Sequence, residues 1–365
     1  MKGRIHKKII EIISNSGRNG ITESELVAQF REQFGNISKR DIVIRVGKLL
    51  YDGVVEIEEV DHTKVIKLRG NTEKLENFTE TERVGKSNQI VHVTTPSYHY
   101  KVQDVEEYIG EAEDIEDAKQ ILQAGENLLL SGDRGIGKSL LAANIAKEWN
   151  IPRYSFNCSH GLNESDLVGY YINFSTFVDG IITQAVKTAC NGEDAMLVIE
   201  EINAINPGVS LMLHSLLDFQ RQLEIKPTGE VLHLNGTGKL YIVATANIGY
   251  EGLFTLNRAL HSRFIEKKLR FPSDSILSKI LKKNGIESAH ERNTIIGIVK
   301  AMKQSYEKGE LDDYPTIREM KQYSVIRRFK DVRDAIQLIF FDKFVKSKVS
   351  EDVVKNIVKS IVPGF

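Results

Sequence analysis

The sequence is poor in the residues that build crosslinked or membrane-embedded proteins. Its 365 residues include two cysteines, Cys158 and Cys190, and one tryptophan. Two cysteines are too few for a disulfide framework or a zinc site, so we expect both to be reduced thiols. No apolar run approaches the ~18 residues of a membrane-spanning helix, and the first residues lack the apolar core of a secretory signal. These absences predict a cytoplasmic protein with no membrane partner.

An excess of charge of one sign is also lacking. The chain has 49 Lys and Arg residues against 50 Asp and Glu residues, which gives a formal net charge of −1. This balance excludes a general affinity of the whole molecule for polyanions, although local patches can still bind them. Hydrophobic residues make up 41% of the chain and charged residues 27%, as in ordinary globular proteins, and the length allows two or three domains.

The most informative segment that is present is a glycine-rich stretch. An apolar run, Leu128–Leu130, precedes the pattern G-x-x-x-x-G-K-S, and a helix-patterned segment, 140–149, follows it. This order predicts a strand, a phosphate-binding loop and a helix. The predicted nucleotide-binding residues are consecutive: Gly132, Asp133, Arg134, Gly135, Ile136, Gly137, Lys138, Ser139 and Leu140.

The chemistry of phosphate binding explains why the loop needs these residue types. Glycines let the backbone curl so that successive N–H groups point inward, and the N-terminus of the following helix adds positive partial charge. We expect Lys138 to reach the β- and γ-phosphates and the Ser139 hydroxyl to ligate Mg²⁺. The sequence therefore predicts a site for a nucleotide with its metal ion.

Two carboxylates follow a second apolar run, Met196–Ile199. In phosphate-loop ATPases an acidic residue at such a strand end helps to hold the metal, and the next carboxylate polarises the attacking water. Successive side chains point to different sides where a strand ends, so the two residues can divide these roles. We therefore expect Glu200 to be a metal residue, together with Ser139, and Glu201 to be catalytic.

Amide and guanidinium groups follow further along the chain, in an order that fits the same chemistry. A third predicted strand, 239–244, is followed by Asn247, which can hydrogen-bond the water or the γ-phosphate. Arginines can stabilise the charge on a transferring phosphoryl group, and a neighbouring subunit can supply them. Any one arginine taken alone reads as a surface cation. Their order predicts a catalytic set made of Glu201, Asn247, Arg258, Arg263 and Arg318.

The first 70 residues read as a separate small unit. Apolar spacing predicts helices near 5–13 and 26–30 and a third over 39–51, and alternation over 54–60 and 65–68 predicts a hairpin. Thr22 with Glu25, and Ser38, are predicted helix caps. Three helices followed by a two-stranded ribbon resemble a winged helix-turn-helix domain.

The third helix of this unit carries four cations that are candidate DNA contacts: Lys39, Arg40, Arg45 and Lys48. Such a helix can enter the major groove. Winged helices also dock proteins, however, and residues 1–70 carry only 13 Lys and Arg against 10 Asp and Glu, a net charge of +3. DNA and protein therefore both remain open as partners. Residues 71–104 read as a polar linker, and 102–123 as an acidic helix that leads to the nucleotide site.

The stretch from about 105 to 365 resembles an AAA+ ATPase, and within that class the MoxR family, on the motifs just described. The resemblance implies an αβα P-loop NTPase core over 105–272 and a helical lid over 273–365. The winged-helix domain at 1–70 that precedes them is not a routine part of the family, so the family says nothing about its partner. It also implies hairpins over 166–180 and 223–238, a magnesium-dependent ATPase reaction, and Arg263 rather than Arg258 as the arginine finger. Arg318 matches the arginine of the lid, and Asn247 matches sensor 1.

The resemblance carries further implications for partners. It implies a homo-oligomer, a hexameric ring, that remodels a protein or protein–DNA complex, with a von Willebrand factor A type protein as a candidate client. The sequence departs from the family at Glu200, where Asp is usual, which alters the metal geometry. A DNA-directed motor or loader tethered by the winged helix, and a non-catalytic nucleotide switch, are the alternative functions.

Overall fold

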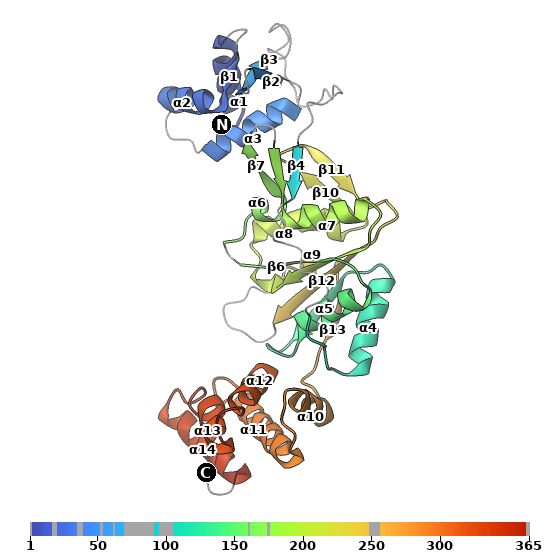
Figure 1. Cartoon of the computed structure of the whole chain (residues 1–365), viewed down its shortest axis with the longest axis vertical. Coiled ribbons are helices and arrows are strands. Elements are labelled where there is room, and N and C mark those ends of the chain that lie inside the picture. Colours follow the sequence, from blue (N-terminus) through green and yellow to red (C-terminus); the bar gives the residue numbers. More distant parts are fainter. Residues whose placement is uncertain are drawn as a thin grey trace. The chain divides into compact units, whose positions relative to one another are not determined.

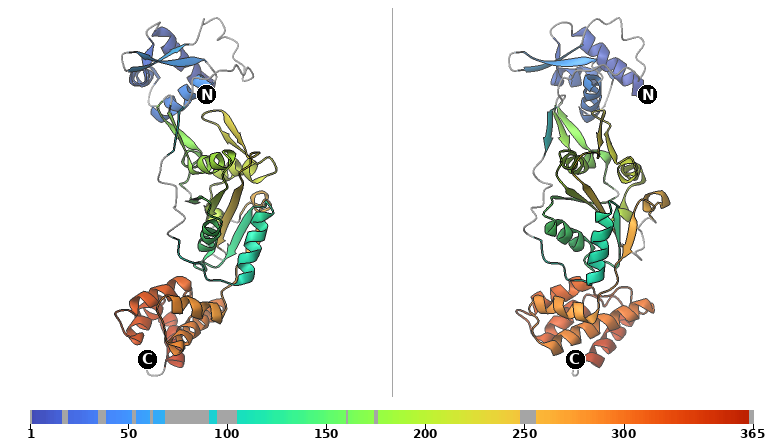
Figure 2. Two further views of the ribbon diagram at one scale, coloured as in Figure 1. Left: turned by 45° about the vertical axis from the view of Figure 1, so that its right-hand side comes forward. Right: turned by 90° about the vertical axis from the view of Figure 1, so that its right-hand side faces the viewer.

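The structure is a computed structural model, and it describes the chain in ten stretches. These are residues 2–16, 20–34, 39–51, 54–60, 63–68, 91–94, 105–159, 161–173, 176–247 and 256–362. The chain forms two compact units, each built from several stretches of sequence. Figure 1 labels the helices and strands along the chain, and Figure 2 shows them in two further views. The first contains Met1–Tyr100, Pro152–Leu197 and Ile205–Leu240; the second contains Lys101–Ile151, Val198–Ala204 and Tyr241–Phe365.

The N-terminal part of the first unit contains three helices and an antiparallel sheet with the order β1-β3-β2. The elements are α1 (Lys2–Asn15), β1 (Ile21–Thr22), α2 (Glu23–Phe34), α3 (Lys39–Tyr51), β2 (Val55–Val60) and β3 (Thr63–Leu68). The apolar positions at helical spacing are buried, among them Ile9, Leu26 and Val46. The predicted capping box is present, because the Thr22 and Glu25 backbone N–H groups each donate to the other residue's side chain. The predicted cap Ser38 lies outside the described residues.

The remainder of the first unit carries two antiparallel hairpins, β7–β8 and β10–β11, at the places that the sequence indicated. The strands are β4 (Val91–Thr94), β6 (Arg153–Asn157), β7 (Gly169–Asn173), β8 (Thr176–Asp179), β10 (Gln222–Ile225) and β11 (Glu230–His233). The helices are α6 (Glu164–Leu167), α7 (Ile181–Cys190) and α8 (Pro207–Leu217).

Strand β4 corrects the description of 71–104 as an irregular linker, because it pairs with β8 in parallel. Its sequence, Val-His-Val-Thr, is rich in β-branched residues, which favour a pleated strand once a partner edge is available.

A five-stranded sheet with the order β13-β5-β12-β9-β6 forms the centre of the α/β core. Besides β6, its strands are β5 (Leu128–Gly132), β9 (Ala195–Glu200), β12 (Leu240–Asn247) and β13 (Ile265–Lys268). The helices of this part are α4 (Ala112–Gln123), α5 (Lys138–Glu148) and α9 (Arg258–His261). Strands β12 and β13 both pair with β5 in parallel, and every residue of β5 and β9 is buried. Parallel strands covered on both faces require such continuous apolar runs. The predicted α/β class is confirmed.

The predicted acidic helix over 102–123 is wrong in its first half. Helix α4 begins at Ala112, and 105–111 is not helical, while 102–104 lies outside the described residues. The backbone of 105–108 bonds to side chains of α5 instead of forming helical hydrogen bonds. Tertiary contacts thus override the local helical tendency of this acidic segment.

The C-terminal region of the second unit is helical, as predicted. It contains α10 (Asp274–Lys283), α11 (Ala289–Glu307), α12 (Ile317–Ile326), α13 (Val332–Ile336), a π-helical turn (Gln337–Phe341) and α14 (Lys348–Ile361). Leu277, Ile295, Met302, Tyr323 and Phe340 are fully buried in its core. Among the helices that the structure describes, none combines the length and hydrophobicity needed to span a bilayer.

Candidate nucleotide-binding site

The glycines of the phosphate loop adopt a backbone that other residues avoid. Gly132, Gly135 and Gly137 have φ angles of +145°, +66° and +101° between β5 and α5. A Cβ atom at Gly132 would lie 2.6 Å from the carbonyl oxygen of Leu269. Glycine is therefore required at Gly132 both for the conformation and for the close approach of a neighbouring backbone. The loop ends at Lys138, where α5 begins.

Lys138 folds back over the loop. Its Nζ donates to the carbonyl oxygens of Gly132 at 3.0 Å and Asp133 at 2.6 Å. Burial lowers the pKa of Lys138 to about 8, although the negative charges of Asp133, Glu200 and Glu201 act in the opposite direction. The loop thus holds a buried ammonium group at the place where phosphate charge would be neutralised.

Ser139 and Glu200 are brought together from separate elements. The Ser139 hydroxyl donates to Oε2 of Glu200, and only 9% of Glu200 is exposed at the end of β9. Mg²⁺ prefers oxygen ligands and is usually held by one or two carboxylates together with water and substrate phosphates. The two side chains fit such a metal, and within the described stretches no cluster of three or more acidic, His or Cys side chains offers an alternative site.

Glu201 and Asn247 face each other beside this pair. Asn247 is the last residue of β12, and its Nδ2 lies 3.4 Å from Oε1 of Glu201. Asn203 donates to the Asn247 carbonyl oxygen at 3.2 Å, which orients the strand end. The carboxyl ends of β5, β9 and β12 therefore gather an ammonium, a hydroxyl, two carboxylates and an amide at one edge of the sheet.

The predicted arginines lie on different elements. Arg318 is exposed in the first turn of α12, and its Cβ lies 3.7 Å from the position that a Cβ of Gly135 would take. The lid therefore reaches the phosphate loop at this residue. Arg258 begins α9 and is exposed. Arg263 follows α9, is partly buried, and its guanidinium donates to the Ala259 carbonyl oxygen.

Sequence reasoning missed the ion pairs that tie the phosphate loop to the lid. Arg134 pairs with both carboxylate oxygens of Asp313, and Asp133 lies 3.5 Å from Nζ of Lys303. The partners are separated by more than a hundred residues, so no local pattern could reveal them. Arg134 and Asp133 were predicted as loop members, and their side chains prove to be lid contacts.

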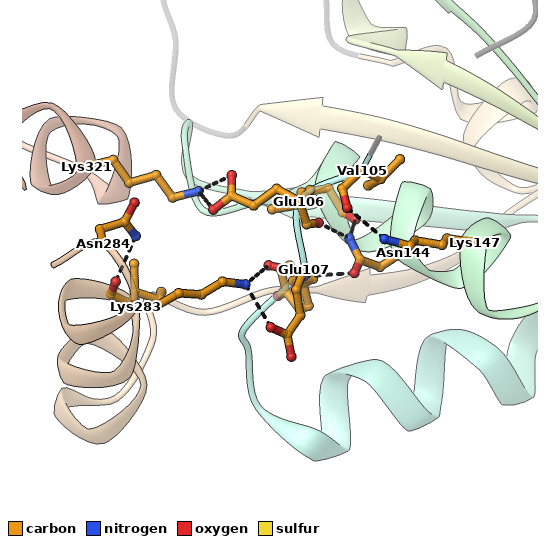
Figure 3. A network of polar contacts seen from close by, with 11 residues as sticks. Val105, Glu106, Glu107, Asn144, Lys147, Lys283, Asn284 and Lys321 are labelled. Carbon is orange, nitrogen blue, oxygen red and sulfur yellow. Dashed lines mark hydrogen bonds and ion pairs between the residues drawn. The ribbon is translucent and has the colours of Figure 1, made fainter. Parts of the chain in front are cut away.

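A second link between lid and core is the strap, defined here as residues 105–108 (Figure 3). Lys321 of α12 pairs with Glu106 at 2.7 Å, and Lys283 of α10 pairs with Glu107 at 2.8 Å. On the other side, Asn144 of α5 bonds to the Glu106 carbonyl oxygen and the Tyr108 N–H, each at 2.8 Å. The strap thus joins two lid helices to the helix that carries Lys138 and Ser139.

The Tyr108 side chain extends from the strap to the phosphate loop. Its ring lies 2.9 Å from the position that a Cβ of Gly137 would take. Burial raises the pKa of the Tyr108 hydroxyl to about 12. Tyr108 therefore stays neutral beside the loop, and its ring crowds any Cβ at 137, where the φ angle of +101° already favours glycine.

Among the candidate DNA contacts on α3, the structure describes the side chains of Lys39 and Arg45, and these two show no comparable convergence. Lys39 is exposed and pairs with Glu23 at 2.8 Å, and Arg45 is partly buried. The side chains of Arg40 and Lys48 lie outside the described part of the structure. The described cations of α3 thus include one that already has an acidic partner on α2.

A curled glycine loop between a buried parallel strand and a helix, with acidic groups at the end of a nearby strand, defines a P-loop nucleotide-binding domain. Residues 127–264 match the family model described as AAA domain (dynein-related subfamily). The matched segment contains the phosphate loop, both carboxylates of the strand end, Asn247 and both arginines of 256–264. The α/β core has the fold of an AAA+ P-loop NTPase.

Proteins from staphylococci match this chain in sequence over about two thirds of its length. An uncharacterized protein of Staphylococcus saprophyticus is 28% identical over 261 residues, which are 68% of this chain and 97% of the relative. An uncharacterized protein of Staphylococcus haemolyticus is 26% identical over 264 residues, which are 69% of this chain and 97% of the relative.

Solved structures of RuvB from Thermotoga maritima are also similar. One mutant is 19% identical with a TM-score of 0.42, over 69% of this chain and 77% of that chain. The structure of the RuvB Holliday junction branch migration motor is 20% identical with a TM-score of 0.39, over 69% of this chain and 70% of that chain.

Proposed function

We propose that this protein is a magnesium-dependent ATPase that works as a ring of like subunits, a hexamer, and remodels a protein or protein–DNA complex. The observation that carries the proposal is the meeting of Lys138, Ser139, Glu200, Glu201 and Asn247 at the carboxyl ends of three strands. No single sequence motif contains all five residues, whereas hydrolysis of a nucleoside triphosphate uses each of their side chains.

Each side chain has a distinct task in this reaction. The Lys138 ammonium neutralises the β- and γ-phosphates, and the backbone N–H groups of the loop bind their oxygens. Ser139 and Glu200 would hold Mg²⁺, which offsets phosphate charge when bound. Glu201 polarises the attacking water, and Asn247 orients both that water and the Glu201 carboxylate.

The MoxR-like assignment and the ring belong to the same proposal. The hairpins β7–β8 and β10–β11 support it, because the resemblance places two such hairpins before the sensor-1 strand. We propose Arg263 as the finger that reaches the neighbouring subunit's ATP, with the exposed Arg258 as second candidate, and Arg318 as the lid arginine. A protein client of von Willebrand factor A type fits this account.

A DNA-directed motor or loader is the second candidate. The order of three helices and a hairpin at the N-terminus, with four cations assigned to α3, favours it. Contacts to DNA phosphates give binding that weakens steeply with salt. DNA binding measured at two salt concentrations therefore separates this candidate from a purely protein-directed one. A non-catalytic switch would bind ATP without releasing phosphate.

Release of phosphate from ATP tests the proposal directly. Lys138→Ala removes the buried ammonium, so we expect turnover to fall at least about 100-fold, the scale of losing one charge-stabilising group. Lys119→Ala is the matched control, since Lys119 pairs with Glu148 at 2.6 Å on the outside of the core. Unchanged turnover in Lys138→Ala, or no turnover in the unmodified protein, would overturn the assignment.

A further inference from the structure

One buried hydroxyl outside the predicted catalytic set contacts both acidic residues at the end of β9. Thr245 lies in β12 and is 2% exposed. Its Oγ1 donates to Oε2 of Glu200 at 3.0 Å and accepts from the backbone N–H of Glu201 at 3.1 Å. A single hydroxyl thus holds the side chain of one carboxylate residue and the backbone of the other.

The backbone at Glu201 needs such support. Its φ angle of +54° lies in the left-handed region, which is unfavourable for a residue with a Cβ. Strand β9 ends at Glu200, so the N–H of Glu201 leaves the regular strand at this point. The hydroxyl of Thr245 gives that N–H an acceptor, and the resulting turn brings the Glu201 carboxylate to 3.4 Å from the Asn247 amide.

The side chain of Glu200 needs orienting for a different reason. A glutamate has three side-chain torsions, so its carboxylate is less restrained by the backbone than that of an aspartate. Oε2 of Glu200 accepts hydrogen bonds from both Ser139 and Thr245, and these two donors come from different elements. Hydrogen bonds to a metal-binding carboxylate fix its orientation and are part of the site's function.

We propose that Thr245 is a positioning residue that sets the orientation of the metal-side carboxylate, Glu200, relative to the water-side carboxylate, Glu201. This inference rests on the ATPase activity proposed above, because that activity gives the two carboxylates their roles. Thr245 acts only through its neighbours and has no part in contacting phosphate or water.

The test compares two substitutions, of which only one keeps the hydroxyl. Thr245→Val removes the hydroxyl and keeps the shape, whereas Thr245→Ser keeps the hydroxyl. We expect Thr245→Val to lower kcat about 10- to 100-fold and to raise the Mg²⁺ concentration needed for half-maximal ATP binding, as loss of such supporting bonds does at metal sites. At saturating Mg²⁺, KM for ATP should change little, because the phosphate loop is intact. Thr245→Ser should recover most of kcat.

A second buried threonine supplies the control for lost stability. Thr183 of α7 is fully buried, and its hydroxyl donates to the Val168 carbonyl oxygen at 2.6 Å. Thr183→Val removes a buried hydroxyl whose hydrogen-bond partner, the Val168 carbonyl oxygen, is not part of the proposed site. It should lower the melting temperature while kcat and the Mg²⁺ requirement of the folded protein stay unchanged.

Two results would overturn the inference. One is a folded Thr245→Val variant with unchanged kcat and unchanged Mg²⁺ requirement; the other is a Thr245→Ser variant as impaired as Thr245→Val. If the unmodified protein binds ATP but releases no phosphate, the ATPase proposal fails by itself. The Mg²⁺ dependence of ATP binding in the same variants then still decides the role of Thr245.

Discussion

Two regions of this chain are predicted to bind phosphate groups: the phosphate loop and helix α3. They differ in the structural support for the prediction. At the phosphate loop, Lys138 and Ser139 at the start of α5 meet Glu200 at the end of β9: Ser139 donates to Glu200, and the charge of Glu200 acts on Lys138. On α3, the candidate cations lie on one helix, and Lys39 already pairs with Glu23. The comparison teaches that convergence of unlike groups from distant segments supports a site more strongly than a row of like charges.

The largest expected effect is at the water-side carboxylate. Glu201→Gln keeps the size of the side chain but removes the base, so turnover should fall about 10²- to 10⁴-fold while ATP remains bound. Glu200→Gln should instead make ATP binding respond less to added Mg²⁺. Phosphate release and ATP binding measured on both variants check this assignment, and the reverse pattern would show that the two carboxylates exchange roles.

The next effect tests whether the site is completed by a neighbouring subunit. Arg263→Ala should lose turnover about 10³-fold if its guanidinium acts on the transferring phosphoryl group. Mixing it with Lys138→Ala should restore part of the activity, because each variant supplies the group that the other lacks. No recovery in assembled mixtures would contradict a finger acting between subunits, and the same experiment with Arg258→Ala distinguishes the two arginines.

A smaller effect follows from the pKa of Lys138. Burial lowers this pKa to about 8, so the ammonium loses its proton, and its attraction for phosphate, as the pH rises above about 8. ATP affinity should then fall by up to about tenfold per pH unit, since one pKa unit corresponds to about 1.36 kcal/mol. Lys138→Arg should bind ATP without this dependence, because a guanidinium keeps its charge. Equal pH profiles for both proteins would contradict the argument.

The smallest effect is expected on α3. Replacing Lys39 and Arg45 together with Ala should leave phosphate release unchanged. If α3 contacts DNA phosphates, the double variant should reduce the salt dependence of DNA binding by about one to two in log–log slope. An unchanged slope would show that these two residues do not contact DNA phosphates. The prediction that this region binds phosphate groups would then lose their support.

The sequence predicted those features whose determinants are close together in the chain. The phosphate loop, the capping box at Thr22, and the buried runs of β5 and β9 all depend on residues a few positions apart. Asn247 and Glu201 were predicted as site residues, but their contact depends on strand order, which the sequence does not state directly.

Features that depend on tertiary contacts were missed. Arg134 and Asp313 are 179 residues apart, and Thr245 is 44 residues from Glu201, so no periodic pattern links them. The strap was predicted to be helical from its acidic composition. In the structure, the carbonyl oxygens of Val105 and Glu106 accept hydrogen bonds from the side chains of Lys147 and Asn144. Strand β4 was missed because four residues in a polar stretch give little signal without their partner, β8.

Equilibrium binding of labelled ATP, with and without Mg²⁺, tests the central claim most directly. The account predicts that the unmodified protein retains ATP, that Mg²⁺ strengthens the binding through Ser139 and Glu200, and that Lys138→Ala loses most of it. An unmodified protein that is folded yet fails to retain ATP in the presence of Mg²⁺ would contradict the assignment of this loop as a nucleotide site.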